Sequence, residues 1–73
     1  MTVLRPSQSR YGWRRVDARR WWAPDHGSAY LIKGEWWAMN SSSPEVPLAP
    51  VVGPFSSVSE AVEAYDLAME ARR

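Results

Sequence analysis

Two pairs of adjacent tryptophans, Trp21-Trp22 and Trp36-Trp37, constrain the fold of this chain more than any other feature. Both pairs lie in short apolar segments of the kind that form β-strands. Because neighbouring side chains on a strand point to opposite faces, each pair must place one indole on each face of a sheet. A domain of this size has one core, so one tryptophan of each pair is expected to pack inside and the other to face away.

The composition requires that ordinary packing supply the whole core. The chain has 73 residues and no cysteine, which leaves no disulfide framework and no thiolate metal site. Five tryptophans and three tyrosines provide much of the apolar bulk. The sequence predicts a single small domain over residues 11–73, preceded by a flexible basic arm over residues 1–10. A chain lacking residues 1–15 is accordingly expected to fold.

Segments rich in aromatic and β-branched residues predict the strands of a sheet. They are residues 19–23, 28–32, 35–40 and 48–53. A short helix over residues 14–22 is the alternative for the first of them. Pro50 places the last strand at an edge, because proline has no N–H to donate to a neighbouring strand.

Turn chemistry separates these strands. The sequence PDHG at residues 24–27 favours a tight turn, with Gly27 in the left-handed conformation. Lys33 and Gly34 are expected to form a two-residue hairpin loop. The sequence SSSPEVP at residues 41–47 is typical of a flexible loop. Short connections of this kind predict antiparallel pairing.

The C-terminal segment predicts an amphipathic helix. Ser57 followed by Glu60 forms a capping box, which marks the start of a helix that runs to about Arg72. One apolar face is formed by Val58, Ala61, Val62, Tyr65, Ala68 and Met69. A polar stripe, expected to face solvent, is formed by Ser59, Glu63, Asp66 and Glu70. Leu67 lies on the outward side. The predicted fold class is α+β, a small antiparallel sheet of three to four strands packed on one C-terminal amphipathic helix.

The sequence GPFSSVSEAVEAYDLA, at residues 53–68, resembles the end of the plant ethylene-response-factor DNA-binding domain. The matching positions are Gly53, Phe55, Ser57, Glu60, Ala61, Ala64, Tyr65, Asp66 and Ala68. Upstream, Gly34, Trp36 and Ala38 fit the start of a strand of that family. The resemblance covers residues 28–69. It implies a three-stranded antiparallel sheet backed by one helix, an arrangement related to the amino-terminal domains of integrases.

The resembled family reads DNA through arginines and tryptophans on its outer sheet face. In the same register, the outward positions of this chain are Ala29, Leu31, Glu35, Trp37, Met39, Ser41, Ala49 and Val51. None of them is an arginine, so the DNA-reading residues of the family do not carry over. By this register Trp36 and Ala38 face the helix, whereas Trp37 and Met39 form an uncovered apolar patch.

Charge is unevenly distributed along the chain. Residues 1–33 carry seven basic and two acidic side chains, a net charge of +5, and residues 34–73 carry two basic and six acidic ones, a net charge of −4. Either the basic half binds an anionic partner or the two halves neutralise each other. The arginines expected to bind nucleic acid are Arg10, Arg14, Arg15, Arg19 and Arg20. Tryptophans lie among them, and this combination is typical of phosphate contacts next to base stacking.

The residues that catalysis and metal binding need are scarce. His26 is the only histidine, and its neighbours Asp25 and Ser28 lie in one turn, whereas a catalytic triad needs side chains that converge from a scaffold. One histidine without thiolates does not supply the ligands of a metal site, and the glycines are scattered singly. No segment approaches the about 20 apolar residues of a membrane span. The expectation is a cytoplasmic, non-catalytic protein without metal or cofactor.

Two functions therefore remain open. The first is a nucleic-acid-binding module that contacts DNA through its arginine- and tryptophan-rich N-terminal half. The alternative is a protein–protein interaction module, such as a phage-encoded modulator of a host protein, which would use the open sheet face or the outer helix face. Its contacts would be Trp37, Met39 and Leu67. A lesser alternative is an accessory subunit that is stable only as a homodimer. The clustered arginines favour the first function, and the absence of arginines from the expected sheet face favours the second.

Overall fold

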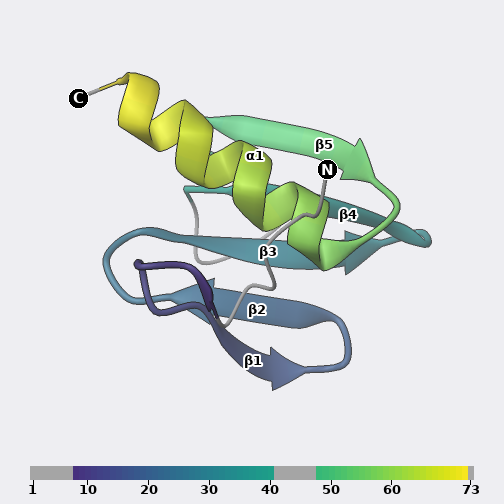
Figure 1. Ribbon diagram of the computed structural model, residues 1–73. Coiled ribbons are helices and arrows are strands. Elements are labelled where there is room, and N and C mark those ends of the chain that lie inside the picture. Colours follow the sequence, from purple (N-terminus) through teal and green to yellow (C-terminus); the bar gives the residue numbers. More distant parts are fainter. Residues whose placement is uncertain (1–7, 41–47, 73) are drawn as a thin grey trace.

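The computed structural model of the chain describes residues 8–40 and 48–72. Five strands form one antiparallel sheet in chain order: β1 (Arg14–Asp17), β2 (Arg20–Ala23), β3 (Gly27–Ile32), β4 (Glu35–Met39) and β5 (Val51–Phe55). One helix, α1 (Val58–Ala71), follows and packs on one face of this sheet (Figure 1). The α+β class is confirmed, and the sheet has five strands instead of three to four.

The arginine-rich N-terminal segment forms a hairpin of two strands. β1 and β2 pair antiparallel, with Arg14 opposite Trp22 and Arg15 opposite Trp21. The strand expected over residues 19–23 is therefore confirmed, and the helical alternative is wrong. β1 is a strand that the sequence does not predict, because the register shifts between Arg15 and Asp17 and interrupts the alternation of side chains.

The turn between β3 and β4 sets the register of the central hairpin. Lys33 and Gly34 form the predicted two-residue loop, with φ angles of 51° and 79° that suit this tight turn. The opposed residue pairs are Ile32–Glu35, Tyr30–Trp37 and Ala29–Ala38. Because directly opposed residues share a face, Ala29 lies on the helix side with Ala38. The expectation that Ala29 and Leu31 face away from the helix is wrong. The expected register of β3 against β4 differs from the observed one by one residue, which exchanges the two faces of β3.

The core lies between α1 and the sheet. The helix contributes Ala61, Val62 and Tyr65, and the sheet contributes Ala23, Ala29 and Ala38, all of them buried. Alanines on the strands let the helix approach closely, and larger side chains such as Trp21 and Trp36 fill the margins. Trp36 therefore lies on the helix side, as predicted. The most buried tryptophan is Trp13, 3% exposed, which precedes β1. A chain lacking residues 1–15 would lose this core residue, so the structure gives a reason against the expectation that such a chain folds.

The start of α1 follows the predicted capping box. The Ser57 hydroxyl accepts a hydrogen bond from the backbone N–H of Glu60 at 3.3 Å and donates one to the Glu60 carboxylate at 3.2 Å. The predicted apolar face is confirmed, because the helix residues in the core all belong to it. Leu67 is 60% exposed, which confirms its outward position.

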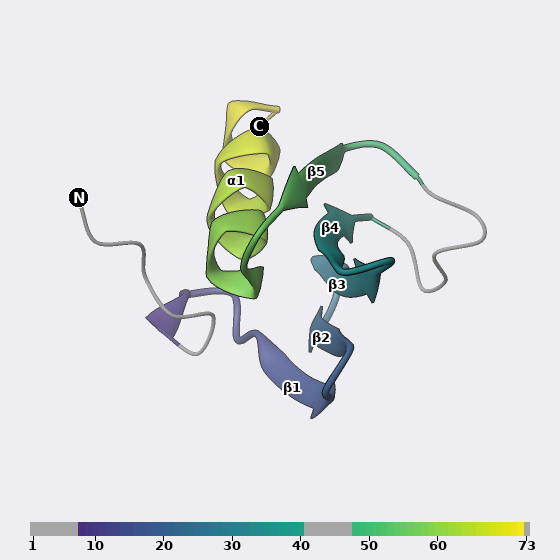
Figure 2. The same cartoon turned by 90° about the vertical axis from the view of Figure 1, so that its right-hand side faces the viewer.

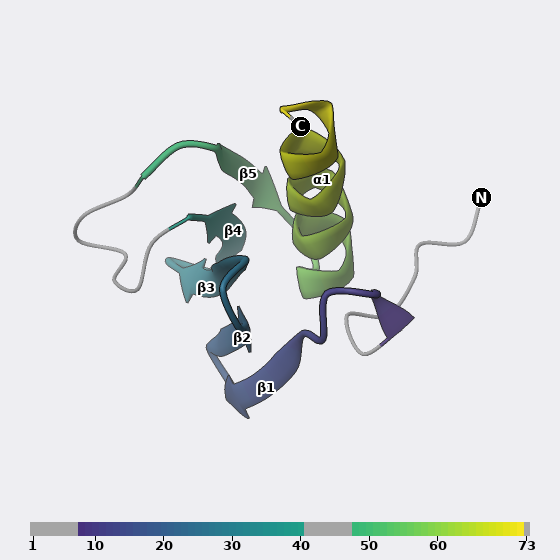
Figure 3. The ribbon, with the colours of Figure 1, turned by 90° about the vertical axis from the view of Figure 1, so that its left-hand side faces the viewer.

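The helix packs mainly on β5, β4 and β3, and the N-terminal hairpin lies beyond the area that the helix covers. Figures 2 and 3 show α1 on one side of β5, β4 and β3, whereas β1 lies at the far edge of the sheet. The β1–β2 hairpin therefore extends away from the helix. Residues 28–69, which carry the family resemblance, hold the strand–strand–strand–helix order that it implies, and the hairpin is an addition to that order.

The sheet face turned away from α1 is called the open face here. Met39 lies on it but is only 3% exposed, so the expected uncovered patch of Trp37 and Met39 is wrong. Trp37 is half-buried, because its ring lies over β5 at Gly53, where an added Cβ would come within 2.8 Å of the indole. The φ angle of Gly53 is 141°, a conformation that also favours glycine. Of the other expected outward positions, Ser41 and the loop at residues 41–47 lie outside the described residues.

Candidate nucleic-acid interface

Three arginines gather on the β1–β2 hairpin. Arg14 and Arg15 belong to β1, and Arg19 lies in the turn that follows it; all three are exposed. We call them the hairpin arginines. Among the residues that the structure describes, none of the three takes part in an ion pair. The hairpin therefore carries three cations that are available to an anionic partner.

The open face also carries an arginine that is fixed in place. Arg20 is opposite Tyr30, and its guanidinium carbon lies 5.7 Å from the centroid of the tyrosine ring. This cation–π contact holds the half-buried side chain against the sheet, where its Nε has no hydrogen-bond partner. Arg14 shares the same face with Trp22. The expectation that the open face lacks arginines is wrong, because β1 and β2 extend that face beyond the strands covered by the resemblance.

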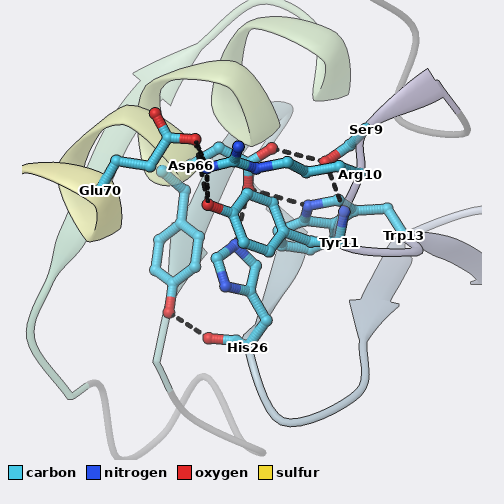
Figure 4. A network of polar contacts seen from close by, with 8 residues as sticks. Ser9, Arg10, Tyr11, Trp13, His26, Asp66 and Glu70 are labelled. Carbon is cyan, nitrogen blue, oxygen red and sulfur yellow. Dashed lines mark hydrogen bonds and ion pairs between the residues drawn. The ribbon is translucent and has the colours of Figure 1, made fainter. Parts of the chain in front are cut away.

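Arg10 lies apart from the other predicted arginines. Its Nη2 is 2.6 Å from the Oε1 of Glu70 and donates a hydrogen bond to the Tyr11 hydroxyl at 2.9 Å (Figure 4). The hydrogen bond to Tyr11 and the charge of Glu70 raise the pKa of Arg10. The positive charge is thus balanced on the helix side of the molecule. Arg10 and Ser9 contact α1, although the sequence assigns them to a flexible arm.

Asp66 holds the segment before β1 against the helix. One carboxylate oxygen, Oδ1, accepts a hydrogen bond from the Trp13 indole at 3.1 Å and lies 2.7 Å from Nε2 of His26. The other, Oδ2, accepts a hydrogen bond from the Ser9 hydroxyl at 2.7 Å (Figure 4). These four residues are the Asp66 network. The solvent-facing role expected for Asp66 is wrong, and the network fixes where β1 begins.

His26 is buried within a group of aromatic rings. Its ring stacks on Tyr11, with centroids 3.8 Å apart and planes inclined by 2°, and it meets Trp13 and Tyr65 edge to face. The sequence predicts only a polar turn at this position. Nothing in the local sequence indicates the burial, because the partners of His26 lie up to 40 residues away.

Tyr65 explains the glycine at the start of β3. Its hydroxyl donates a hydrogen bond to the His26 carbonyl at 2.5 Å, and a Cβ added to Gly27 would lie 2.5 Å from its ring. Gly27 is therefore required by close approach. The left-handed conformation expected at Gly27 occurs at Asp25 instead, with a φ of 56°.

The pKa of Tyr65 predicts a loss of stability at alkaline pH. Burial, assisted by the negative charge of Asp66, raises the pKa of Tyr65 from 10.0 to about 12. Between these two values the folded state keeps a proton that the unfolded state has released, so its stability falls as pH rises from about 10 to about 12. Urea denaturation at about pH 9 and about pH 11 should show a larger loss for the parent than for Tyr65→Phe. An equal loss in both proteins would contradict the assignment.

The outer side of α1 offers a second exposed feature. A hollow of about 350 Å³ lies between residues 8–11 and the helix, and Leu67 and Tyr11 are among its lining residues. Of the contacts expected for a protein partner, Leu67 is thus exposed, Trp37 is half-buried and Met39 is buried.

Within residues 8–40 and 48–72, no three side chains of His, Cys, Asp or Glu come together as a metal site. No helix in the same ranges has the length and apolar character to cross a membrane. Comparison of the chain with protein-family models, with curated proteins and with solved structures gives no match.

Proposed function

We propose that this protein is a small, non-catalytic, DNA-binding module that contacts phosphate through its β1–β2 hairpin. The observation that carries this function is the set of three hairpin arginines, which are exposed and have no ion-pair partner among the described residues. Guanidinium groups form strong, charge-assisted hydrogen bonds with phosphate oxygens. An exposed Trp22 lies opposite Arg14 on the same face, which adds an aromatic surface to the basic one.

The placement of negative charge supports the same function. Four of the acidic side chains belong to α1: Glu60, Glu63, Asp66 and Glu70. They lie on the helix side of the sheet, where Glu70 balances Arg10. Glu35, at the start of β4, lies on the open face with Trp37. Its negative charge would repel phosphate from the β3–β4 turn. The four acidic side chains of α1 are held on the helix, away from the hairpin, whose own acidic residue is Asp17 at the end of β1. The three hairpin arginines therefore outnumber the negative charge beside them.

Substitution of the hairpin arginines tests this function. A variant that combines Arg14→Gln, Arg15→Gln and Arg19→Gln should bind DNA about tenfold more weakly, or weaker still, at about 50 mM salt, since three phosphate contacts are lost. Fluorescence anisotropy with labelled single-stranded and duplex DNA measures the change. Substitutions are used because deletion of the segment would remove Trp13 from the core.

Arg72→Gln is the control for this experiment. Arg72 is exposed at the end of α1, so its loss removes a positive charge from the helix side of the molecule. The affinity of this variant should stay within about twofold of the parent, because a charge outside the interface contributes little at this salt concentration. A triple variant that binds as tightly as Arg72→Gln would contradict a role for the hairpin.

Protein–protein interaction is the second candidate function. It is favoured by one observation, the exposed Leu67 beside the hollow between residues 8–11 and α1. This surface belongs to the helix, whereas the hairpin extends away from the helix. The hairpin variants therefore separate the two candidates, because they leave the surface around Leu67 unchanged.

A further inference from the structure

A shallow hollow lies beside Trp22 on the open face. It has a volume of about 330 Å³, and its lining includes Trp22, Ser28, Asn40 and Leu48. The pairing of β2 with β3 explains why space is left here, since Trp22 is opposite Ser28 and Ala23 is opposite Gly27. Ser28 shares the face of Trp22 and has a small side chain, so the surface beside the indole is low.

The second pair, Ala23 and Gly27, faces the core on the other side of the sheet and adds no side chain to the open face. Gly27 has no room for a side chain, because the ring of Tyr65 occupies the space that a Cβ would need. Ala23 is fully buried against the same core.

The lining combines one flat aromatic surface with hydrogen-bonding groups. Trp22 is 41% exposed, an unusual state for so large an apolar side chain. Asp25 and Asn40 are exposed beside it and supply a carboxylate and an amide. Leu48, also exposed, supplies an apolar surface. A planar ring with polar edges is the kind of ligand that such a lining fits.

We infer that this hollow receives one unpaired nucleobase of single-stranded nucleic acid, stacked on Trp22; this inference rests on the proposed function. Arg14 is opposite Trp22 on the same face, so its guanidinium would meet the phosphate of the strand whose base stacks on the indole. Basic residues that follow the backbone, next to aromatic rings that stack on bases, are how single strands are bound. The volume is near the lower end of ligand pockets, about 300–1,000 Å³, which suits a single base.

Duplex DNA does not supply such a base, because its bases are stacked and paired within the helix. The hollow thus specifies the class of ligand: a single strand, or an unpaired stretch within a duplex, is preferred over a perfect duplex. The hairpin arginines alone would bind both forms through their phosphates.

Two substitutions of Trp22 in the full-length chain test this inference. Trp22→Leu keeps an apolar side chain and removes the aromatic surface, whereas Trp22→Phe keeps an aromatic ring. The probes are a labelled single strand of about twelve nucleotides and the duplex of the same sequence, a length that suits a small stacking site. Thermal melts of both variants establish that they remain folded, as the exposure of Trp22 leads us to expect.

The parent should bind the single strand more tightly than the duplex. Trp22→Leu should weaken single-strand binding about tenfold, the size of one lost base-stacking contact, and leave duplex binding within about twofold. Trp22→Phe should recover most of the lost affinity. Parent-like affinity of Trp22→Leu for the single strand, or an equal loss for both probes, would overturn the inference.

The outcomes also separate this inference from the function on which it rests. If the hairpin-arginine variant loses affinity but Trp22→Leu does not, the DNA-binding function stands and the base site is rejected. If the parent binds neither probe at about 50 mM salt, both are rejected.

Discussion

Replacement of Tyr65 by alanine should leave most of the protein unfolded. Tyr65 is fully buried, meets the rings of Trp13 and His26 edge to face, and donates a hydrogen bond to the His26 carbonyl. Truncation of a core aromatic residue costs about 3–5 kcal/mol. A small domain has a free energy of unfolding of about 5 kcal/mol or a little more, so little stability would remain. Urea denaturation followed by tryptophan fluorescence measures the change.

Two further variants serve as controls for Tyr65→Ala. Leu67→Ala changes an exposed residue of the same helix and should alter the free energy of unfolding by at most about 0.5 kcal/mol. Tyr65→Phe removes only the hydroxyl that bonds the His26 carbonyl and should cost about 1–3 kcal/mol, because a buried acceptor loses its donor. If Leu67→Ala destabilised the protein as much as Tyr65→Ala, the assigned helix faces would be wrong.

Asp66→Ala is expected to have the second large effect on stability. Its carboxylate, mostly shielded from solvent, accepts hydrogen bonds from Trp13 and Ser9 and lies 2.7 Å from His26. Alanine would leave the Trp13 indole, the Ser9 hydroxyl and the His26 ring nitrogen without their partner, and each buried polar group left unpaired costs about 1–3 kcal/mol. The segment before β1 should then detach from the helix and become accessible to protease.

Glu63→Ala is the matched control for Asp66→Ala. Glu63 belongs to the same predicted polar stripe, and its loss should change the free energy of unfolding by at most about 0.5 kcal/mol. Limited proteolysis and urea denaturation of the two variants can be compared directly. An Asp66→Ala protein as stable and as resistant as Glu63→Ala would show that the Asp66 network does not hold the N-terminal segment.

The elements that the sequence predicts correctly are those specified by neighbouring residues. The capping box at Ser57 and the turn at Lys33-Gly34 each act within a few residues, and both form as expected. Helical spacing of apolar residues likewise places Tyr65 inside and Leu67 outside, because a helix has one fixed period.

The features that escape prediction depend on residues far apart in the chain. Ser9 and Asp66 are separated by 57 positions, and nothing near either of them indicates their contact. Trp13 lies in the core and donates its indole N–H to Asp66, although no regular pattern surrounds it in the sequence. The polar stripe of α1 is expected to face solvent, but its residues Asp66 and Glu70 bind the N-terminal segment. These contacts too join residues far apart in the chain.

The faces of the sheet illustrate how a register error spreads. A two-residue turn pairs Ile32 with Glu35, and this pairing fixes every residue of β3 and β4 to one face. The register expected from the resemblance is shifted by one residue in β3. It therefore places Ala29 on the open face, where the structure has Tyr30. It also omits β1 and β2, the strands that bring Arg14 and Arg20 onto the open face.

The dependence of DNA affinity on salt tests phosphate binding by the hairpin most directly. For single strands the logarithm of the binding constant falls with the logarithm of salt concentration by about 0.7 for each phosphate neutralised, so the three hairpin arginines should contribute a slope of about 2. Anisotropy titrations from about 50 mM to about 200 mM salt should show that the triple arginine variant loses this part of the slope, whereas Arg72→Gln keeps it. A triple variant with the slope of the parent would contradict phosphate binding by the hairpin, as would a parent that binds no DNA at about 50 mM salt.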